Sequence, residues 1–165
     1  MPSISLDELD LKIIASLSEN SRIPITALSE MIGVPRTTVA SRIEKLRKLG
    51  VIEGYTLKLN YRLLGYNYLA FILIKARRGK GISNQISLAK RIKRDSEKGK
   101  GFPWVQEAHV ITGDYDILLK VRIREWDELT NFLIRYLARL EEVEHSLTLL
   151  TLTTVYEENN KLEFP

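Results

Sequence analysis

The chain of 165 residues contains no cysteine and only two histidines, His109 and His145. The absence of cysteine excludes disulfides, thiolate zinc sites and cysteine nucleophiles. The longest apolar runs fall far short of a membrane span, and acidic residues occur among the first ten, where a secretory signal would be apolar. Phosphate-binding glycine loops and serine-nucleophile elbows are also missing. We therefore expect a soluble, cytoplasmic protein with no membrane partner, no cofactor and no catalytic residues.

Charge is present in quantity but is unevenly distributed along the chain. Residues 75–101 hold ten basic and two acidic residues, a net charge of +8, whereas residues 102–165 hold six basic and twelve acidic ones, a net charge of −6. Such asymmetry indicates a polyanionic partner or charge-matched self-association. A solvated helix face with no partner is the alternative reading.

The first fifty residues have the pattern of three short helices. The first is expected at about residues 7–19, where Ser5 and Glu8 have the spacing of a capping box. The second is expected at residues 26–32, and the third begins near Pro35 and ends before Gly50. Two helices joined by a tight, glycine-containing turn form a helix-turn-helix.

The third helix has the chemistry of a DNA-recognition helix, which enters the major groove and reaches base edges from its N-terminal residues. Arginine can bridge guanine, and threonine or serine can reach bases or phosphates. A charged outer face is also common on any amphipathic helix, but small hydroxyl residues at its start favour DNA binding. We expect the following residues to contact DNA: Arg36, Thr37, Thr38, Ser41, Arg42, Lys45, Arg47 and Lys48.

Residues 68–165 follow the order strand, helix, strand, strand, helix, strand. Residues 68–76 predict a strand that is apolar on both faces, covered by helices on one side and by a partner subunit on the other. A basic helix is expected at residues 83–97 and a second helix at 126–140. The last strand is expected at residues 144–156. The order predicts a ferredoxin-like βαββαβ sandwich and an overall α+β fold class. In that topology the strands carrying His109 and His145 lie at opposite edges of the sheet.

The string GVPRTTVASRIEKLRKLGVIEGY (residues 33–55) resembles the Lrp/AsnC family of bacterial and archaeal transcription regulators (leucine-responsive and asparagine-operon type). Residues 112–116, TGDYD, are similar to the hairpin signature of that family's second, ferredoxin-like domain. The chain departs from the family at Pro35, where serine is usual, and at residues 94–105, which are longer and more basic.

The resemblance implies that the hairpin binds a small effector, usually an amino acid, between subunits. We place a turn at Gly113-Asp114, where Asp114 could meet an ammonium group. A purely structural hairpin is the first alternative. A metal-dependent hydrolase using Asp114, Asp116 and His109 is a remote one, because a metal site needs several convergent ligands. The effector-binding residues expected are Thr112, Gly113, Asp114, Tyr115 and Asp116.

Together these features predict a sequence-specific transcription regulator that binds double-stranded DNA. We expect a helix-turn-helix domain at residues 1–52, a linker strand and hinge at 53–67, and an oligomerisation and effector domain at 68–165. The protein is expected to form dimers, and tetramers or octamers built from them, and to associate with the nucleoid. An architectural protein with weak sequence preference and no effector is the alternative, and the basic stretch 75–101 would favour it.

Overall fold

The computed structural model describes residues 5–77 and 81–157. Contacts divide the chain into two compact units, one running to Leu59 with the residues from Tyr156 onward, and one spanning Asn60–Val155. Among the described residues no helix is long and apolar enough to cross a membrane.

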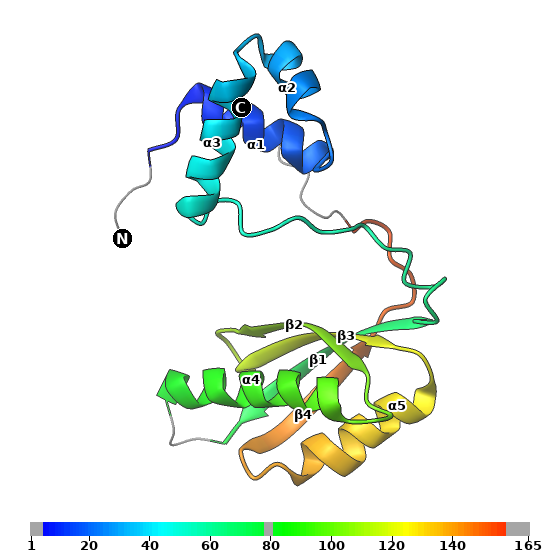
Figure 1. Ribbon diagram of the computed structural model, residues 1–165. Helices are drawn as coiled ribbons and strands as arrows, with labels where there is room; N and C mark the ends of the chain where they lie inside the picture. The colour runs from blue at the N-terminus through cyan, green and yellow to red at the C-terminus, as the bar shows by residue number, and fades with distance from the viewer. Residues whose placement is uncertain (1–4, 78–80, 158–165) are drawn as a thin grey trace. The chain divides into compact units, whose positions relative to one another are not determined.

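The first unit is built from three helices (Figure 1): α1 (Glu8–Glu19), α2 (Ile25–Ile32) and α3 (Arg36–Lys48). Their apolar faces meet in a small core of Ile13, Leu17, Leu28, Val39 and Leu46. The predicted helix-turn-helix is thus present, with Gly33 at φ 78° ending α2 and Gly50 at φ 74° following α3.

The start of α1 differs from the capping box expected of Ser5 and Glu8. The cap is Asp7, whose side chain accepts a hydrogen bond from the backbone N–H of Asp10, while Asp10 accepts one from the backbone of Asp7. An aspartate pair satisfies the free N–H groups in the same way as the expected Ser-x-x-Glu pair.

The linker strand expected within residues 53–67 does not form. No strand is assigned between α3 and Tyr68, and a turn occupies Tyr61–Gly65. A strand is held by hydrogen bonds to a neighbour, and no such backbone bond is recorded for residues 53–59 within the described part of the chain. The alternating apolar side chains Tyr55, Leu57 and Leu59 are exposed.

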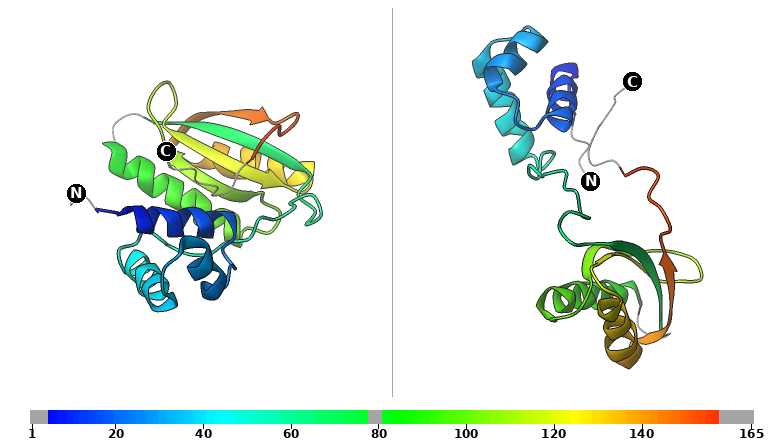
Figure 2. Two further views of the ribbon diagram at one scale, coloured as in Figure 1. Left: turned by 90° about the horizontal axis from the view of Figure 1, so that it is seen from above. Right: turned by 90° about the vertical axis from the view of Figure 1, so that its right-hand side faces the viewer.

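The second unit is a four-stranded antiparallel sheet with helices on one face. Its strands lie in the order β2-β3-β1-β4, so β2 and β4 form the edges as predicted. Figure 2 shows α4 and α5 on the same side of the sheet. The elements are β1 (Tyr68–Ala76), α4 (Gly81–Lys98), β2 (Trp104–Val110), β3 (Ile117–Ile123), α5 (Trp126–Thr130) and β4 (Val143–Leu150).

The two faces of the sheet differ sharply in burial. Ile72 and Leu119 are paired in register and fully buried beneath the helices. The neighbouring pairs Leu73–Leu118 and Leu73–Leu147 lie on the opposite face, which no helix of this unit covers. Leu147 is 41% exposed there and Leu149 is 49% exposed.

Two boundaries in this unit differ from those predicted, at the β2–β3 connection and at the end of the last strand. The β2–β3 connection is a six-residue loop over 111–116, closed by Ile111 N–H to the Asp116 carbonyl at 2.9 Å, rather than a two-residue turn. The helix expected at 126–140 is confirmed, because α5 continues without a break through a π-helical segment (Asn131–Tyr136) and a 3₁₀ turn (Leu137–Arg139). The last strand ends at Leu150 rather than Tyr156.

Candidate functional site

The N-terminal half of α3 presents small polar and basic side chains to solvent. Arg36 and Thr37 are exposed, and Thr38 is half-buried. Ser41 is exposed, and its hydroxyl donates to the Thr38 carbonyl at 3.1 Å. Arg36 makes no ion pair within the described residues, so its guanidinium is available to an external partner.

Two of the expected DNA-contacting cations on α3, Arg42 and Lys45, form ion pairs with α1. Lys45 Nζ donates to Asp10 Oδ2 at 2.8 Å, and Arg42 Nη1 donates to Asp10 Oδ1 at 3.1 Å. Arg42 also pairs with the Asp7 carboxylate. Asp10 itself is fully buried, whereas the side chains of Arg42 and Lys45 remain 29% and 42% exposed. The pair of cations therefore compensates a buried carboxylate and fixes α3 against α1.

The electrostatics of Asp10 agree with this arrangement. Burial raises the pKa of a carboxyl group, but the hydrogen bonds from Lys45, the Asp7 backbone and Arg42 outweigh it and lower the pKa of Asp10. The carboxylate is therefore ionised at neutral pH and needs its two cations.

The C-terminal part of α3 carries a weaker set of ion pairs. Arg47 and Lys48 are both exposed, and each lies 3.9 Å from Glu44. Exposed pairs at this distance contribute little, so both cations can exchange Glu44 for phosphate. The eight expected residues thus fall into two groups. Arg42 and Lys45 fix α3 against α1, and the other six are exposed except for the half-buried Thr38.

The five expected effector residues differ in exposure and in the contacts that they make. Thr112, Gly113 and Asp114 are exposed at the tip of the β2–β3 loop. Tyr115 is half-buried and packs edge-on against His145, with ring centroids 5.6 Å apart. Among the described residues, no group of three or more histidine or acidic side chains is placed to hold a metal ion.

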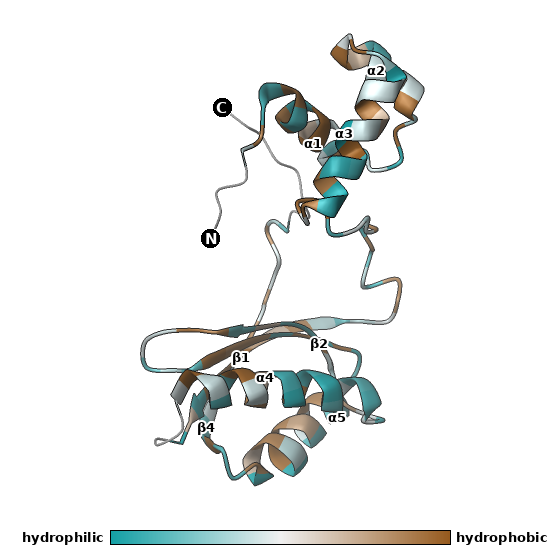
Figure 3. Cartoon of the chain, turned by 60° about the vertical axis from the view of Figure 1, so that its left-hand side comes forward, coloured by the Kyte–Doolittle hydropathy of each residue, from teal (hydrophilic) through white to brown (hydrophobic). Residues whose placement is uncertain are grey.

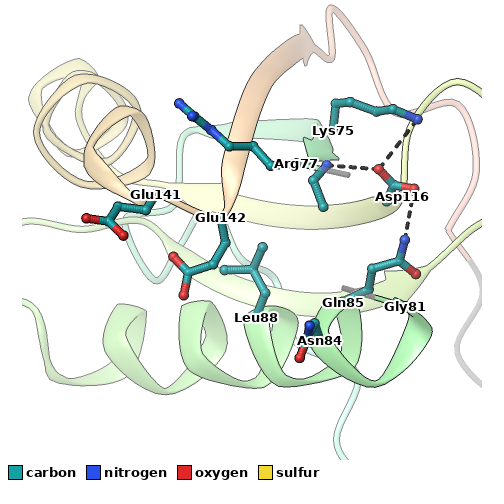
Figure 4. A pocket seen from close by; sticks show the side chains of 10 residues that line it. Lys75, Arg77, Gly81, Asn84, Gln85, Leu88, Asp116, Glu141 and Glu142 are labelled. Atoms are coloured by element: carbon teal, nitrogen blue, oxygen red, sulfur yellow. Dashed lines mark hydrogen bonds and ion pairs between the residues drawn. The ribbon is translucent and has the colours of Figure 1, made fainter. Parts of the chain in front are cut away.

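Asp116 lines a pocket, and its side chain also connects neighbouring elements of the structure. Its Oδ2 accepts from the Ala76 backbone N–H at 2.8 Å and its Oδ1 from Gln85 Nε2 at 2.9 Å. Lys75 Nζ lies 3.5 Å from Oδ2, and the Asp116 N–H donates to the Ile74 carbonyl at 2.9 Å. One carboxylate thus joins the β2–β3 loop to β1 and α4 (Figure 4).

The pocket beside this joint, here called the Asp116 pocket, has a volume of about 680 Å³, which suits a small ligand. Its wall carries charges of both signs. Arg77 is exposed and its Nε donates to the Val143 carbonyl at 3.4 Å. Glu142 is paired with Arg91 at 2.9 Å, whereas no ion pair is recorded for Glu141 within the described residues. The lining also includes Lys75, Gly81, Asn84, Gln85 and Leu88 (Figure 4).

The sequence did not identify these residues as a ligand site, because their types and spacing match no known motif. A signal was nevertheless available in the predicted topology. Lys75 and Arg77 end one strand, Glu141 and Glu142 precede another, and the strand order makes those two strands neighbours. Charged residues at the ends of two neighbouring strands lie close together at one end of the sheet.

A helix-turn-helix unit with a polar recognition helix, and a second α+β unit with a charged pocket, define a DNA-binding regulator with a separate ligand domain. The comparisons agree in detail. The family model for the AsnC-type helix-turn-helix domain matches residues 6–47, and that for the Lrp/AsnC ligand binding domain matches residues 69–160. The chain belongs to the Lrp/AsnC family of transcription regulators, as its sequence predicted.

Individual relatives match over nearly the whole chain. An HTH-type transcriptional regulator of Pyrococcus horikoshii is 37% identical over 96% of this chain and 99% of its own length. The regulator FL11 of Pyrococcus furiosus is 36% identical over 95% of both chains.

Solved structures show the same fold. AsnC of E. coli superposes with a TM-score of 0.78 and 28% identity over 96% of this chain and all of its own. A transcriptional regulator of Neisseria meningitidis, solved as a complex with L-Met, has a TM-score of 0.80 and 22% identity over 94% of this chain and 96% of its own.

Proposed function

We propose that this regulator reads specific duplex DNA with the exposed residues of α3 and responds to an amino acid, or a related small molecule, bound in the Asp116 pocket. Acting on the chromosome, it works in the cytoplasm at the nucleoid. The observation that carries the proposal is the division of α3 into an inner pair that fixes the helix and an outer set that is free.

DNA recognition is assigned to the N-terminal half of α3 because its outer groups differ in kind. Arg36 offers the planar donor pair that suits guanine, while Thr37 and Thr38 offer hydroxyl and methyl groups. Arg47 and Lys48 follow at the other end of the helix, where contacts to phosphate are expected. Base reading by the first group and positioning by the second together give sequence specificity.

Effector binding is assigned to the Asp116 pocket because its charges match a zwitterion. The Arg77 guanidinium suits a carboxylate, and the Glu141 carboxylate suits an ammonium group. The L-Met complex of the N. meningitidis regulator supports an amino acid as ligand. Of the five loop residues expected from the sequence, Asp116 lines the pocket, so we assign Thr112, Gly113, Asp114 and Tyr115 no direct contact.

Self-association is assigned to the open face of the sheet. Leu73, Leu118, Leu147 and Leu149 line this face in adjacent strands and are not covered by helices. A contiguous apolar face of this kind marks an interaction surface. A second copy of the chain packed there gives a dimer, the building block for the tetramer or octamer expected of the family.

The proposal is tested by selecting duplexes from a random library and titrating them with protein in the presence of each of the twenty amino acids. We expect a preferred site and a change in its affinity with at least one amino acid. By linkage, DNA must shift the affinity for that amino acid by the same factor. Equal binding to selected and scrambled duplexes would overturn the assignment of α3, and an unaltered response in Arg77→Gln would overturn that of the pocket.

A further inference from the structure

Helix α4 carries a row of basic side chains on the side away from the hydrophobic core. Positions two residues apart on a helix are separated by about 200°, so they face opposite ways. Leu88, Ile92 and Ser96 are buried, and the residue two positions after each is an exposed cation. These residues, with an exposed lysine just beyond the helix, form the α4 basic row: Lys90, Arg94, Lys98 and Lys100.

The charge of this row is not neutralised within the unit. No ion pair is recorded for Lys90, Lys98 or Lys100 among the described residues. Arg94 lies 3.5 Å from Asp95 but its side chain is 62% exposed, which leaves the guanidinium open to other partners. Figure 3 shows the C-terminal half of α4 coloured mostly as hydrophilic, in contrast with the strands.

The two acids on α4 already have partners within the unit. Glu97 pairs with Lys93 at 2.7 Å. Asp95 accepts a hydrogen bond from the Tyr136 hydroxyl at 2.8 Å, which, with the nearby arginines, lowers the pKa of Asp95. The helix therefore presents a continuous positive face.

We propose that the α4 basic row is a second DNA contact, which binds the phosphate backbone of duplex DNA outside the site read by α3. Steps of four residues give about 6 Å between successive cations of the row along the helix. Flexible lysines dominate the row, and they bind phosphate as point charges without reading sequence. The contact is therefore independent of sequence and sensitive to salt.

A phosphate backbone fits this row better than the acidic surface of another copy of the chain. Several acids of the second unit are already bound within it: Glu142 to Arg91, Glu107 to Lys120, and Glu128 to the Arg124 N–H at 2.8 Å. No comparable row of free carboxylates faces solvent on one helix of the described residues. Duplex DNA, in contrast, offers a continuous line of negative charge.

The proposal rests on DNA binding by the proposed function and adds that the bound DNA extends beyond the recognised site. It is tested with the full chain on two duplexes. One is the shortest selected duplex that keeps full specificity for α3, and the other carries roughly two further helical turns of unselected sequence on each side. The double variant Lys90→Gln/Lys98→Gln is compared with Arg135→Gln/Arg139→Gln, which removes two exposed charges from the other helix of the sandwich.

We expect Lys90→Gln/Lys98→Gln to weaken binding of the extended duplex alone, and to reduce the slope of log K against log salt by about 1.8, or 0.9 for each lost phosphate contact. The control variant and the short duplex should show no such change. If both double variants lost the same affinity for the extended duplex, the loss would come from the change in net charge alone, and the proposal would be overturned. An unchanged slope with a smaller assembly in sedimentation would also overturn it, and would make the row a subunit contact. Failure of specific binding on the short duplex would instead count against the proposed function.

Discussion

Lys45 Nζ on α3 lies 2.8 Å from Oδ2 of Asp10 on α1. This contact connects the helix assigned to DNA reading with a carboxylate that has no exposure to solvent. Since Arg42 binds the other oxygen of the same carboxylate, the orientation of α3 depends on one buried charge in a different helix. Asp10 is therefore a positioning residue for the recognition helix.

Asp10→Asn is expected to lower the free energy of unfolding of the first unit by about 1–3 kcal/mol, because a neutral amide replaces a buried carboxylate that accepts from two cations. The folded-state pKa of Asp10 is lowered, so its contribution is complete above its ordinary value of 3.8 and is lost as the pH falls through the folded-state value. The difference between wild type and variant should therefore shrink below about pH 4. Denaturant unfolding at several pH values measures it.

The matched control for this variant is Glu8→Gln. Glu8 also belongs to α1 and pairs with Lys12 at 2.6 Å, but that pair is exposed. Its loss should have little effect on unfolding at any pH. If the two variants unfolded alike, the buried network would have no special part in holding α3.

Arg36→Ala is expected to weaken binding of the selected duplex by about 1–3 kcal/mol and to leave binding of random DNA nearly unchanged, if the guanidinium reads a base. Fluorescence anisotropy with both duplexes at one salt concentration measures this. Arg22→Ala, at an exposed position between α1 and α2, is the control and should affect neither. A uniform loss on both duplexes would make Arg36 a phosphate contact.

Arg77→Gln is expected to reduce the affinity for the effector amino acid by about tenfold or more, because the charge-assisted hydrogen bond to the carboxylate of the ligand is lost. Asp114→Ala, at the exposed tip of the loop, should leave that affinity unchanged, contrary to what the sequence suggested. Calorimetric titration of the ligand measures both. A loss with Asp114→Ala and none with Arg77→Gln would return the site to the loop tip.

Leu147→Asp is expected to lower the stability of the assembly, because it puts a charge on the open apolar face of the sheet. Ile134→Asp is the control, since Ile134 is 64% exposed on the helical side. Sedimentation over a range of protein concentrations measures the association constant. Equal behaviour of the two variants would show that the open face is not the subunit contact.

Periodicity and turn residues in the sequence were sufficient to predict the three helices of the first unit and the strand order of the second. They were sufficient because each element has its own apolar face, such as the one that Leu88 and Ile92 form on α4. The prediction of a linker strand was wrong, because an alternating run such as residues 55–59 forms a strand only where a neighbouring strand can pair with it. The length of the β2–β3 loop was predicted wrongly, because the loop is closed by the backbone of Asp116 and not by a turn at Gly113.

The site residues were predicted less completely, for a physical reason. Basic residues on the outer side of α3 look equivalent in sequence, but a buried acid thirty-two residues before Arg42 decides which of them are free. Pairing between Asp10 and α3 is a tertiary contact that no local pattern records. The pocket depends likewise on residues from four separate elements.

The central claim is tested most directly by the specificity ratio of the full chain. This ratio is the affinity for a selected duplex divided by the affinity for a scrambled duplex of equal length at the same salt concentration. A regulator that reads bases through α3 is expected to show a ratio of at least about 10³. A ratio near 1, with steep salt dependence on both duplexes, would contradict it and would identify an architectural DNA-binding protein instead.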